Sequence, residues 1–131
     1  MTKANTAEVV KGYIAALNGG DPDEIARFVT EDFQNEHTSA RGQSLRGRSA
    51  YRERLGSFLS TFANLYYHIE DLIVEEDRAA LPYRMTFNWL GNGPPGRPVE
   101  IRGMFRFRVV GQEIAHRVDY WDSSEVERQI R

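Results

Sequence analysis

The first half of the chain carries apolar residues at helical spacing. Apolar side chains between positions 9 and 17 fall on one face of a helix, which Asn5 would cap and a glycine pair would end. Asp21 followed by Pro22 predicts the start of a second, short helix. Residues 32–38 predict a short strand, followed by a loop rich in glycine, serine and arginine. A third helix is predicted from another apolar series at helical spacing, which is Tyr51, Leu55, Phe58, Leu59 and Phe62.

After residue 65 the apolar period changes to two, which is the period of a strand. Residues 65–74 predict one strand, and Glu76-Asp77 predicts a tight turn after it. Two long alternating segments follow, separated by a loop at 91–98 that is rich in glycine and proline. The inward face of these two segments is predicted to hold Leu81, Tyr83, Met85, Phe87, Trp89, Val99, Ile101, Gly103, Phe105, Phe107 and Val109. A hairpin leads to a last strand at 113–122, and the tail after it predicts one helical turn.

Helices come first and strands follow, an order that predicts an α+β fold. We expect three N-terminal helices to pack on one face of a curved, mostly antiparallel sheet, in a single domain that spans residues 1–131. A sheet that curls around helices encloses a cone-shaped interior. Where the helices do not fill that interior, a pocket for a small molecule remains.

Composition narrows the function classes. The 131 residues carry a formal net charge of -2, which gives no electrostatic basis for binding nucleic acid or an anionic membrane. The sequence shows no signal pattern or membrane-length apolar run, so we expect a cytoplasmic location. The chain has no cysteine, and its three histidines, His37, His68 and His116, lack the spacing of metal ligands. We therefore expect no metal and no cofactor, and the predicted partner is a small hydrophobic ligand.

The segment 117–122, RVDYWD, places carboxylates among large aromatic residues in the last predicted strand. Simple alternation puts Asp119 on the face of Arg117 and Trp121, opposite a more apolar face, and so directs it outward, where it would pair with an arginine of a neighbouring strand. A β-bulge would instead turn Asp119 into the interior. An apolar cavity would then raise the pKa of its carboxyl, and Arg117 on the same face would lower it. A raised pKa would suit proton transfer near neutral pH.

Further candidates come from residue type and position. His37 has an intrinsic pKa near neutrality and suits acid–base chemistry, or it is a strand-end histidine with a structural role. Tyrosines and tryptophans of the apolar stripes either line the cavity or belong to the core, and the core is favoured for Tyr13 and Tyr51. The predicted ligand-binding residues are Tyr13, Asn35, Tyr51, Tyr83, Trp89, Phe105, Arg117 and Trp121.

Several motifs are spread over nearly the whole chain. They are NGGDPDEIARFVTEDF at 18–33 with His37 soon after it, GNGPPGRPVEIRG at 91–103, FRVVGQEI at 107–114 and the closing DYWD at 119–122. Together they resemble the SnoaL-like polyketide cyclases and related ester cyclases of the nuclear transport factor 2-like fold. Gln112-Glu113-Ile114 stands where this family usually has Gly-Lys-Ile.

The resemblance implies roles for individual residues. Asp119 falls where the polyketide cyclases, and the limonene-1,2-epoxide hydrolases of the same fold, have an essential aspartate. His37 falls where the steroid isomerases of the fold have a general base, and Asn35 lies two residues earlier on the same strand face. The arginine–aspartate pair of the hydrolases has no counterpart near Tyr83. The resemblance also implies a homodimer, and the basic outer face of the sheet is one place for that contact.

The favoured hypothesis is cofactor-independent proton transfer on a small, apolar, carbonyl-bearing ligand. The resemblance implies an intramolecular aldol cyclisation of a polyketide-like ester. In this scheme Asp119 moves the proton beside the carbonyl, while His37 and a tyrosine orient the ligand or stabilise the enolate oxygen. Two alternatives stay open. One is a module that binds a ligand or a partner without chemistry; the other is an isomerase or epoxide hydrolase of the same fold, which would need a second inward carboxylate or a positioned water.

Overall fold

The computed structural model describes residues 3–131 and forms an α+β fold, as the order of elements predicts. Its elements, in chain order, are α1 Lys3–Gly19, α2 Pro22–Ala26, β1 Val29–His37, β2 Leu45–Arg46, α3 Arg48–Thr61, β3 Phe62–Ile69, β4 Ile73–Glu75, β5 Arg78–Trp89, β6 Arg97–Val110, β7 Glu113–Tyr120 and α4 Ser123–Ile130. The strands form one curved sheet in the order β2-β1-β7-β6-β5-β3, with β4 paired to β5. Every strand pair is antiparallel except β1 with β7.

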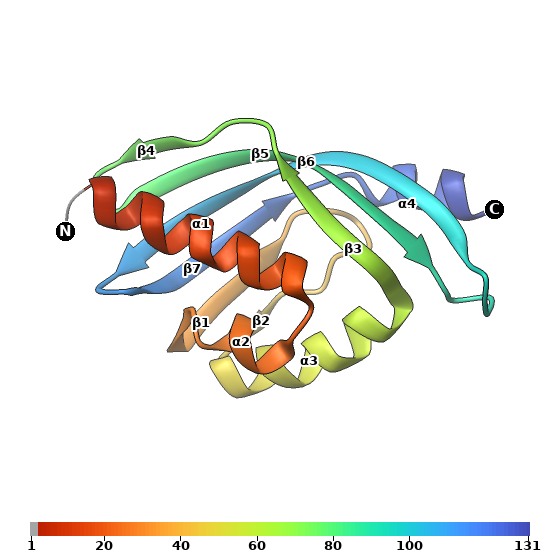
Figure 1. Cartoon of the computed structure of the whole chain (residues 1–131), viewed down its shortest axis with the longest axis horizontal. Helices are drawn as coiled ribbons and strands as arrows, with labels where there is room; N and C mark the ends of the chain where they lie inside the picture. Colours follow the sequence, from red (N-terminus) through yellow and green to blue (C-terminus); the bar gives the residue numbers. More distant parts are fainter. Residues whose placement is uncertain (1–2) are drawn as a thin grey trace.

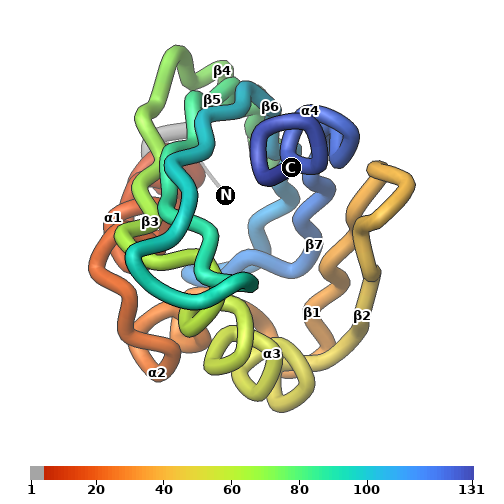
Figure 2. Tube along the Cα trace, turned by 90° about the vertical axis from the view of Figure 1, so that its right-hand side faces the viewer, coloured from red at the N-terminus to blue at the C-terminus, as the bar shows by residue number. Residues whose placement is uncertain are grey.

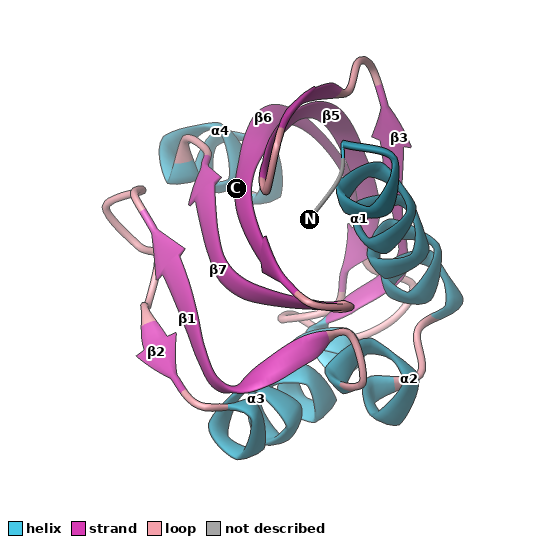
Figure 3. Ribbon diagram, turned by 90° about the vertical axis from the view of Figure 1, so that its left-hand side faces the viewer, coloured by secondary structure: helices cyan, strands magenta, loops and turns pink. Residues whose placement is uncertain are grey.

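The curved sheet wraps around the helices of the N-terminal half. Figures 1 and 3 show α1 lying across its concave side, with α2 and α3 along the lower end. Helix α4 packs against β6, away from α2 and α3. There the Gln129 side chain accepts a hydrogen bond from the backbone N–H of Glu100 and donates one to the carbonyl of the same residue. The three predicted N-terminal helices are therefore present. The tail forms an eight-residue helix in place of the single turn predicted for it.

Local signals explain some boundaries and fail at others. Asp21 caps α2 as predicted, since its carboxylate accepts the N–H of Asp23 at 2.9 Å. Asn5 lies inside α1 and is not its cap. Its side chain instead donates to the carbonyl of Gly111, which ties the helix to the β6–β7 turn. The predicted strand at 65–74 is wrong as a single element, because the chain breaks after Ile69 and resumes as β4.

The inward faces of β5 and β6 form the main core. Their alternation is as predicted: Leu81, Tyr83, Met85, Phe87, Val99, Ile101, Phe105, Phe107 and Val109 are buried, and Trp89 is half-buried. The apolar face of α1 packs onto this surface with Val9, Val10, Tyr13, Ile14 and Leu17 buried. Removing one such aliphatic or aromatic side chain from water is worth roughly 1.5–3 kcal/mol, so this layer fixes how the sheet curves over the helices.

A β-bulge in β7 decides which side chains face the interior. Val109 pairs with Ile114 while Arg108 pairs with His116, so Ala115 is an extra residue on β7. Ile114 is buried before the bulge. After it, Arg117 and Asp119 stand opposite the inward-facing Phe107 and Phe105. The bulge therefore turns the two charged residues of this strand into the cone, against the outward direction that simple alternation predicts.

Candidate active site

One cavity of about 90 Å³ lies between the concave sheet, α3 and α4. Its floor is made of buried polar residues from β1, β5 and β7, which are Asn35, Tyr83, Arg117 and Asp119. At the opposite end the lining residues Arg54, Phe58 and Val126 are only half-buried. The mouth of the cavity therefore lies between α3 and α4. Figure 2 shows these two helices at the end of the molecule that faces the viewer.

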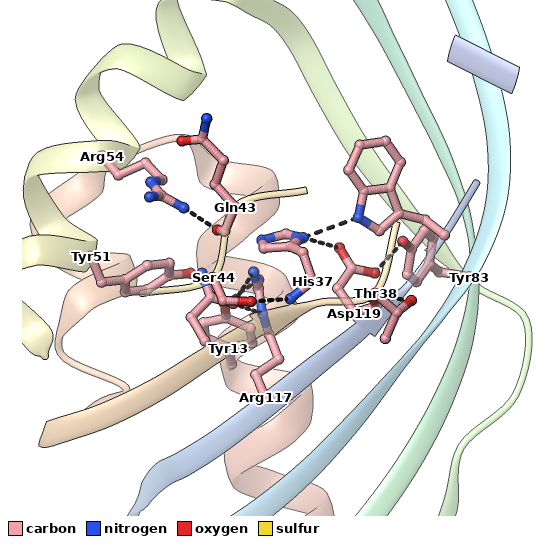
Figure 4. A network of polar contacts seen from close by, with 12 residues as sticks. Tyr13, His37, Thr38, Gln43, Ser44, Tyr51, Arg54, Tyr83, Arg117 and Asp119 are labelled. Atoms are coloured by element: carbon pink, nitrogen blue, oxygen red, sulfur yellow. Dashed lines mark hydrogen bonds and ion pairs between the residues drawn. The ribbon is translucent and has the colours of Figure 1, made fainter. Parts of the chain in front are cut away.

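Asp119 presents both carboxylate oxygens to polar partners inside this cavity (Figure 4). The Tyr83 hydroxyl donates to Oδ1 at 2.6 Å, and Nδ1 of His37 lies 3.6 Å from Oδ2. Only 5% of Asp119 is exposed. Burial raises the pKa of its carboxyl to about 6, against the opposing effects of the Arg117 charge and of the Tyr83 hydrogen bond. Asp119 can thus both accept and return a proton near neutral pH.

His37 stands beside Asp119 as a neutral imidazole. The indole N–H of Trp121 donates to its Nδ1 at 3.0 Å, so this nitrogen carries no proton and the hydrogen of the neutral ring lies on Nε2. Burial, followed by the charges of Arg117 and Arg54, lowers the pKa of His37 to about 3. The contact with Asp119 is therefore not an ion pair at neutral pH. His37 therefore adds no positive charge to that of Arg117 that would lower the pKa of Asp119 further.

Gly103 makes room for the hydrogen bond between Tyr83 and Asp119. These residues lie on β5 and β7, and the β6 residue directly beside Tyr83 is Gly103. A Cβ at this glycine would lie 2.5 Å from the Tyr83 hydroxyl oxygen and 2.8 Å from the carbonyl oxygen of Tyr120, closer than such atoms approach. The missing side chain lets the phenol cross β6 and reach the carboxylate.

Arg117 is a buried cation held by neutral groups. Its Nε and Nη2 donate to Oδ1 of Asn35 at 3.0 and 2.7 Å, and Nη1 donates to the Tyr13 hydroxyl at 2.8 Å. Its guanidinium carbon lies 4.9 Å from the centre of the Phe105 ring. Within the described part of the chain, no carboxylate forms an ion pair with it. These bonds use three of its five N–H groups, so the charge keeps capacity for a further oxygen.

Two tyrosines form a chain of hydrogen bonds with Arg117. The Tyr13 hydroxyl accepts a hydrogen bond from Arg117 and is hydrogen-bonded to the Tyr51 hydroxyl. Arg117 cannot accept a hydrogen bond, so the Tyr13 proton has only the Tyr51 oxygen to go to. With Tyr13 as the donor of this bond, the Tyr51 proton points away from Tyr13. Because Tyr51 lines the cavity, this proton is available to a ligand oxygen.

The structure brings most of the predicted residues together. Asn35, His37, Tyr51, Tyr83, Arg117, Asp119 and Trp121 all line the cavity. Tyr13 and Phe105 lie behind its wall, where both contact Arg117. Trp89 is half-buried at the end of β5 and is not among the residues that line the cavity.

Sequence reasoning missed Arg54. It lies three residues after Tyr51 and four before Phe58, so helical spacing alone puts it on the face that lines the cavity. Sequence reasoning also gave Gly103 no role beyond a place on the inward face. The effect of this glycine depends on the register of β5 and β6, which sets it beside Tyr83.

The described residues contain no group of three or more histidine, cysteine, aspartate or glutamate side chains placed to hold a metal ion. No helix among them is both long and apolar enough to cross a membrane.

A curved sheet around three helices, with a polar floor beneath an apolar cavity, defines a protein of the ketosteroid isomerase-like, nuclear transport factor 2-like fold. The model of the SnoaL-like polyketide cyclase family matches residues 7–130, and the chain belongs to that family.

Solved structures agree on the fold. A hypothetical protein of ketosteroid isomerase-like fold from Catenulispora acidiphila has a TM-score of 0.83 and 21% identity, covering 94% of this chain and 92% of its own. A proposed polyketide cyclase from Xanthomonas campestris pv. campestris has a TM-score of 0.83 and 20% identity, covering 98% of both chains. A proposed SnoaL-like polyketide cyclase from Jannaschia sp. CCS1 has a TM-score of 0.82 and 18% identity, covering 98% and 92%. No curated protein matches the chain.

Proposed function

We propose that this protein catalyses cofactor-independent proton transfer on a small hydrophobic carbonyl compound, with an intramolecular aldol cyclisation as the reaction. One observation carries the proposal: the carboxyl of Asp119 is buried in a mostly apolar cavity, and its pKa is raised to about 6. Membership of the SnoaL-like polyketide cyclase family supports the same class of chemistry.

The proposed reaction starts at the carbon next to a ligand carbonyl. The Asp119 carboxylate removes a proton from that carbon, and the C–H electron pair forms an enolate. The enolate carbon then attacks a second carbonyl of the same ligand and forms a carbon–carbon bond. The oxygen of that second carbonyl then takes the proton from Asp119, and Asp119 is again a carboxylate. No atom is gained or lost, so the step requires no oxidant, reductant or leaving group.

The residues around Asp119 have separate tasks in this scheme. Tyr51 donates its free hydroxyl proton to the developing enolate oxygen, and the positive charge of Arg117 acts on the same oxygen through Tyr13. His37 stays neutral and offers its Nε2 hydrogen to the ligand. Tyr83 holds Oδ1 of Asp119, so Oδ2 is the oxygen that takes the proton.

Deuterium exchange tests this proposal without the natural substrate. The probe is 2-tetralone, an aromatic ketone with acidic hydrogens beside its carbonyl, and loss of their proton NMR signal in heavy water gives the rate. We expect exchange above the buffer background, lowered about 100-fold or more by Asp119→Asn and unchanged by the exposed Asp71→Asn. Since the carboxylate is the active form, the rate should rise as the pH increases through about 6 and then level off.

The same assay separates proton-transfer catalysis from binding without chemistry. If 2-tetralone raises the melting temperature but does not exchange faster than in buffer, the catalytic proposal fails and the site is a binding module. Exchange that Asp119→Asn leaves unchanged would remove this residue as the base. Epoxide hydrolysis has little support, because Asp119 is the one carboxylate among the described residues that line the cavity.

A further inference from the structure

Three arginines of α3 differ in what they face. Arg48 pairs with Glu113 at 2.9 Å, and Arg52 pairs with Asp23 at 2.6 Å. Arg54 lines the cavity, and no carboxylate of the described residues lies within ion-pair distance of it. Its Nη1 donates to the backbone carbonyl of Gln43, in the loop between β1 and β2 (Figure 4). The one cation of this helix that reaches the cavity is thus without an anionic partner.

The charges around the cavity are unbalanced in favour of an anion. Two guanidinium groups, those of Arg54 and Arg117, line it, and arginine stays protonated at any working pH. The opposing charge comes from Asp119 alone, which is protonated in part near pH 6, while His37 is neutral. Part of the lowering of the His37 pKa comes from Arg54, so the field of this charge reaches the polar floor.

The size of the cavity sets where a ligand must extend. Its volume of about 90 Å³ is smaller than the roughly 150 Å³ of an engineered cavity that encloses one benzene molecule. A ligand with its reacting carbonyl at Asp119 and more than one ring therefore continues outward through the mouth. Arg54 is half-buried at that mouth, and the outer part of the ligand must pass it.

We propose that Arg54 forms an anion-binding subsite at the mouth of the cavity, and that the ligand of this protein carries a carboxylate at the end away from its reacting carbonyl. This inference rests on the proposed function for the position of that carbonyl. The substrate class is therefore an acid with an apolar middle and its two reacting carbonyls at the inner end. The competing explanation for Arg54 is structural: its guanidinium would only tie the loop at residue 43 to α3.

A pair of probes that differ in charge separates the two explanations. They are 4-acetylbenzoate and its methyl ester, whose dissociation constants are measured by isothermal titration calorimetry. We expect the wild-type protein to bind the acid about tenfold more tightly than the ester, as a charge-assisted hydrogen bond allows. Arg54→Gln should abolish this preference and leave the affinity for the ester unchanged, and Arg54→Lys should keep part of it. Arg52→Gln, which removes a paired arginine of the same helix, should keep all of it.

Three results would overturn the subsite. These are equal affinity of the wild-type protein for the acid and the ester, survival of the preference in Arg54→Gln, and equal weakening of both probes by Arg54→Gln, as a loop tie predicts. Binding of these probes requires no proton transfer, so Asp119→Asn should retain the preference. If the wild-type protein exchanges 2-tetralone but binds the acid no more tightly than the ester, the subsite alone is refuted. If it prefers the acid but does not exchange 2-tetralone, the catalytic proposal alone is refuted.

Discussion

Asp119→Asn should stabilise the folded protein at neutral pH, although it removes the proposed base. The folded state holds this carboxyl in an apolar cavity, where burial raises its pKa from 3.8 to about 6. An asparagine amide has nearly the same shape, and its oxygen can still accept the Tyr83 hydroxyl. The substitution therefore removes the burial of a charge while it keeps the hydrogen bond.

The size and sign of the effect follow from the two pKa values. A carboxyl with a folded pKa above its unfolded value binds its proton more tightly when folded. Its contribution to stability is present below about pH 3.8 and is lost as the pH rises through about 6. Above about pH 6 the free energy of unfolding is lower by about 3 kcal/mol than it is when this carboxyl is protonated. The variant has no such carboxyl, so its advantage over the wild type should grow between these pH values and stay constant above them.

Urea unfolding, followed by circular dichroism from about pH 4 to about pH 8, measures this difference. Asp71→Asn removes the same charge at an exposed position and serves as the control. We expect the Asp119 variant to gain stability relative to wild type as the pH rises, and the control to show no such trend. If Asp119→Asn is less stable than wild type at about pH 8, or if the difference does not change with pH, then the carboxylate is not penalised by burial and our account of its basicity is wrong.

Three further substitutions test the groups around this carboxylate. Gly103→Ala should displace the Tyr83 hydroxyl, and carbon-13 NMR should show the Asp119 pKa rising above about 6 because a bond that lowers it is lost. Tyr83→Phe removes the same hydrogen bond without the steric clash, so it should also raise the pKa of Asp119. It should destabilise the fold less than Gly103→Ala does, as measured by urea unfolding. A lower Asp119 pKa in either variant would contradict this. Trp121→Phe removes the donor to Nδ1 of His37, so nitrogen-15 NMR should show the Nδ1–H tautomer; an unchanged spectrum would mean that another group fixes the ring.

The fold could be predicted well from the sequence because its main signals are local and repeated. Alternation along β5 and β6 names the core correctly, since one buried face imposes a period of two over many residues. Element ends are less predictable. Asn5 has the residue type of a cap, yet it bonds with the β6–β7 turn, whose approach depends on the tertiary fold. The break between β3 and β4 likewise follows from the pairing of both strands with β5, although Asp71 stands within it.

The site could be predicted in its residue types but not in its geometry. The orientation of Asp119 depends on one extra residue, Ala115, and the sequence around it has no glycine or proline to mark a bulge. The bond between Asp119 and Tyr83 depends on the register that places Gly103 between them. Arg54 is different, because its spacing from Tyr51 along α3 already indicated a position on the cavity face.

The separation of Arg117 from Asp119 explains how one strand can hold a buried cation and a usable base. They are two residues apart on the same face of β7, at a distance along the strand of roughly 6.5 Å, so they do not form a contact pair. A direct ion pair would lower the pKa of Asp119 and leave it a weak base at neutral pH. Instead Asn35 and Tyr13 hold the guanidinium, and Tyr83 holds the carboxylate. Each charge is satisfied by neutral partners, so both remain available to a ligand: the carboxylate to take a proton, and the guanidinium to favour the negative oxygen that results.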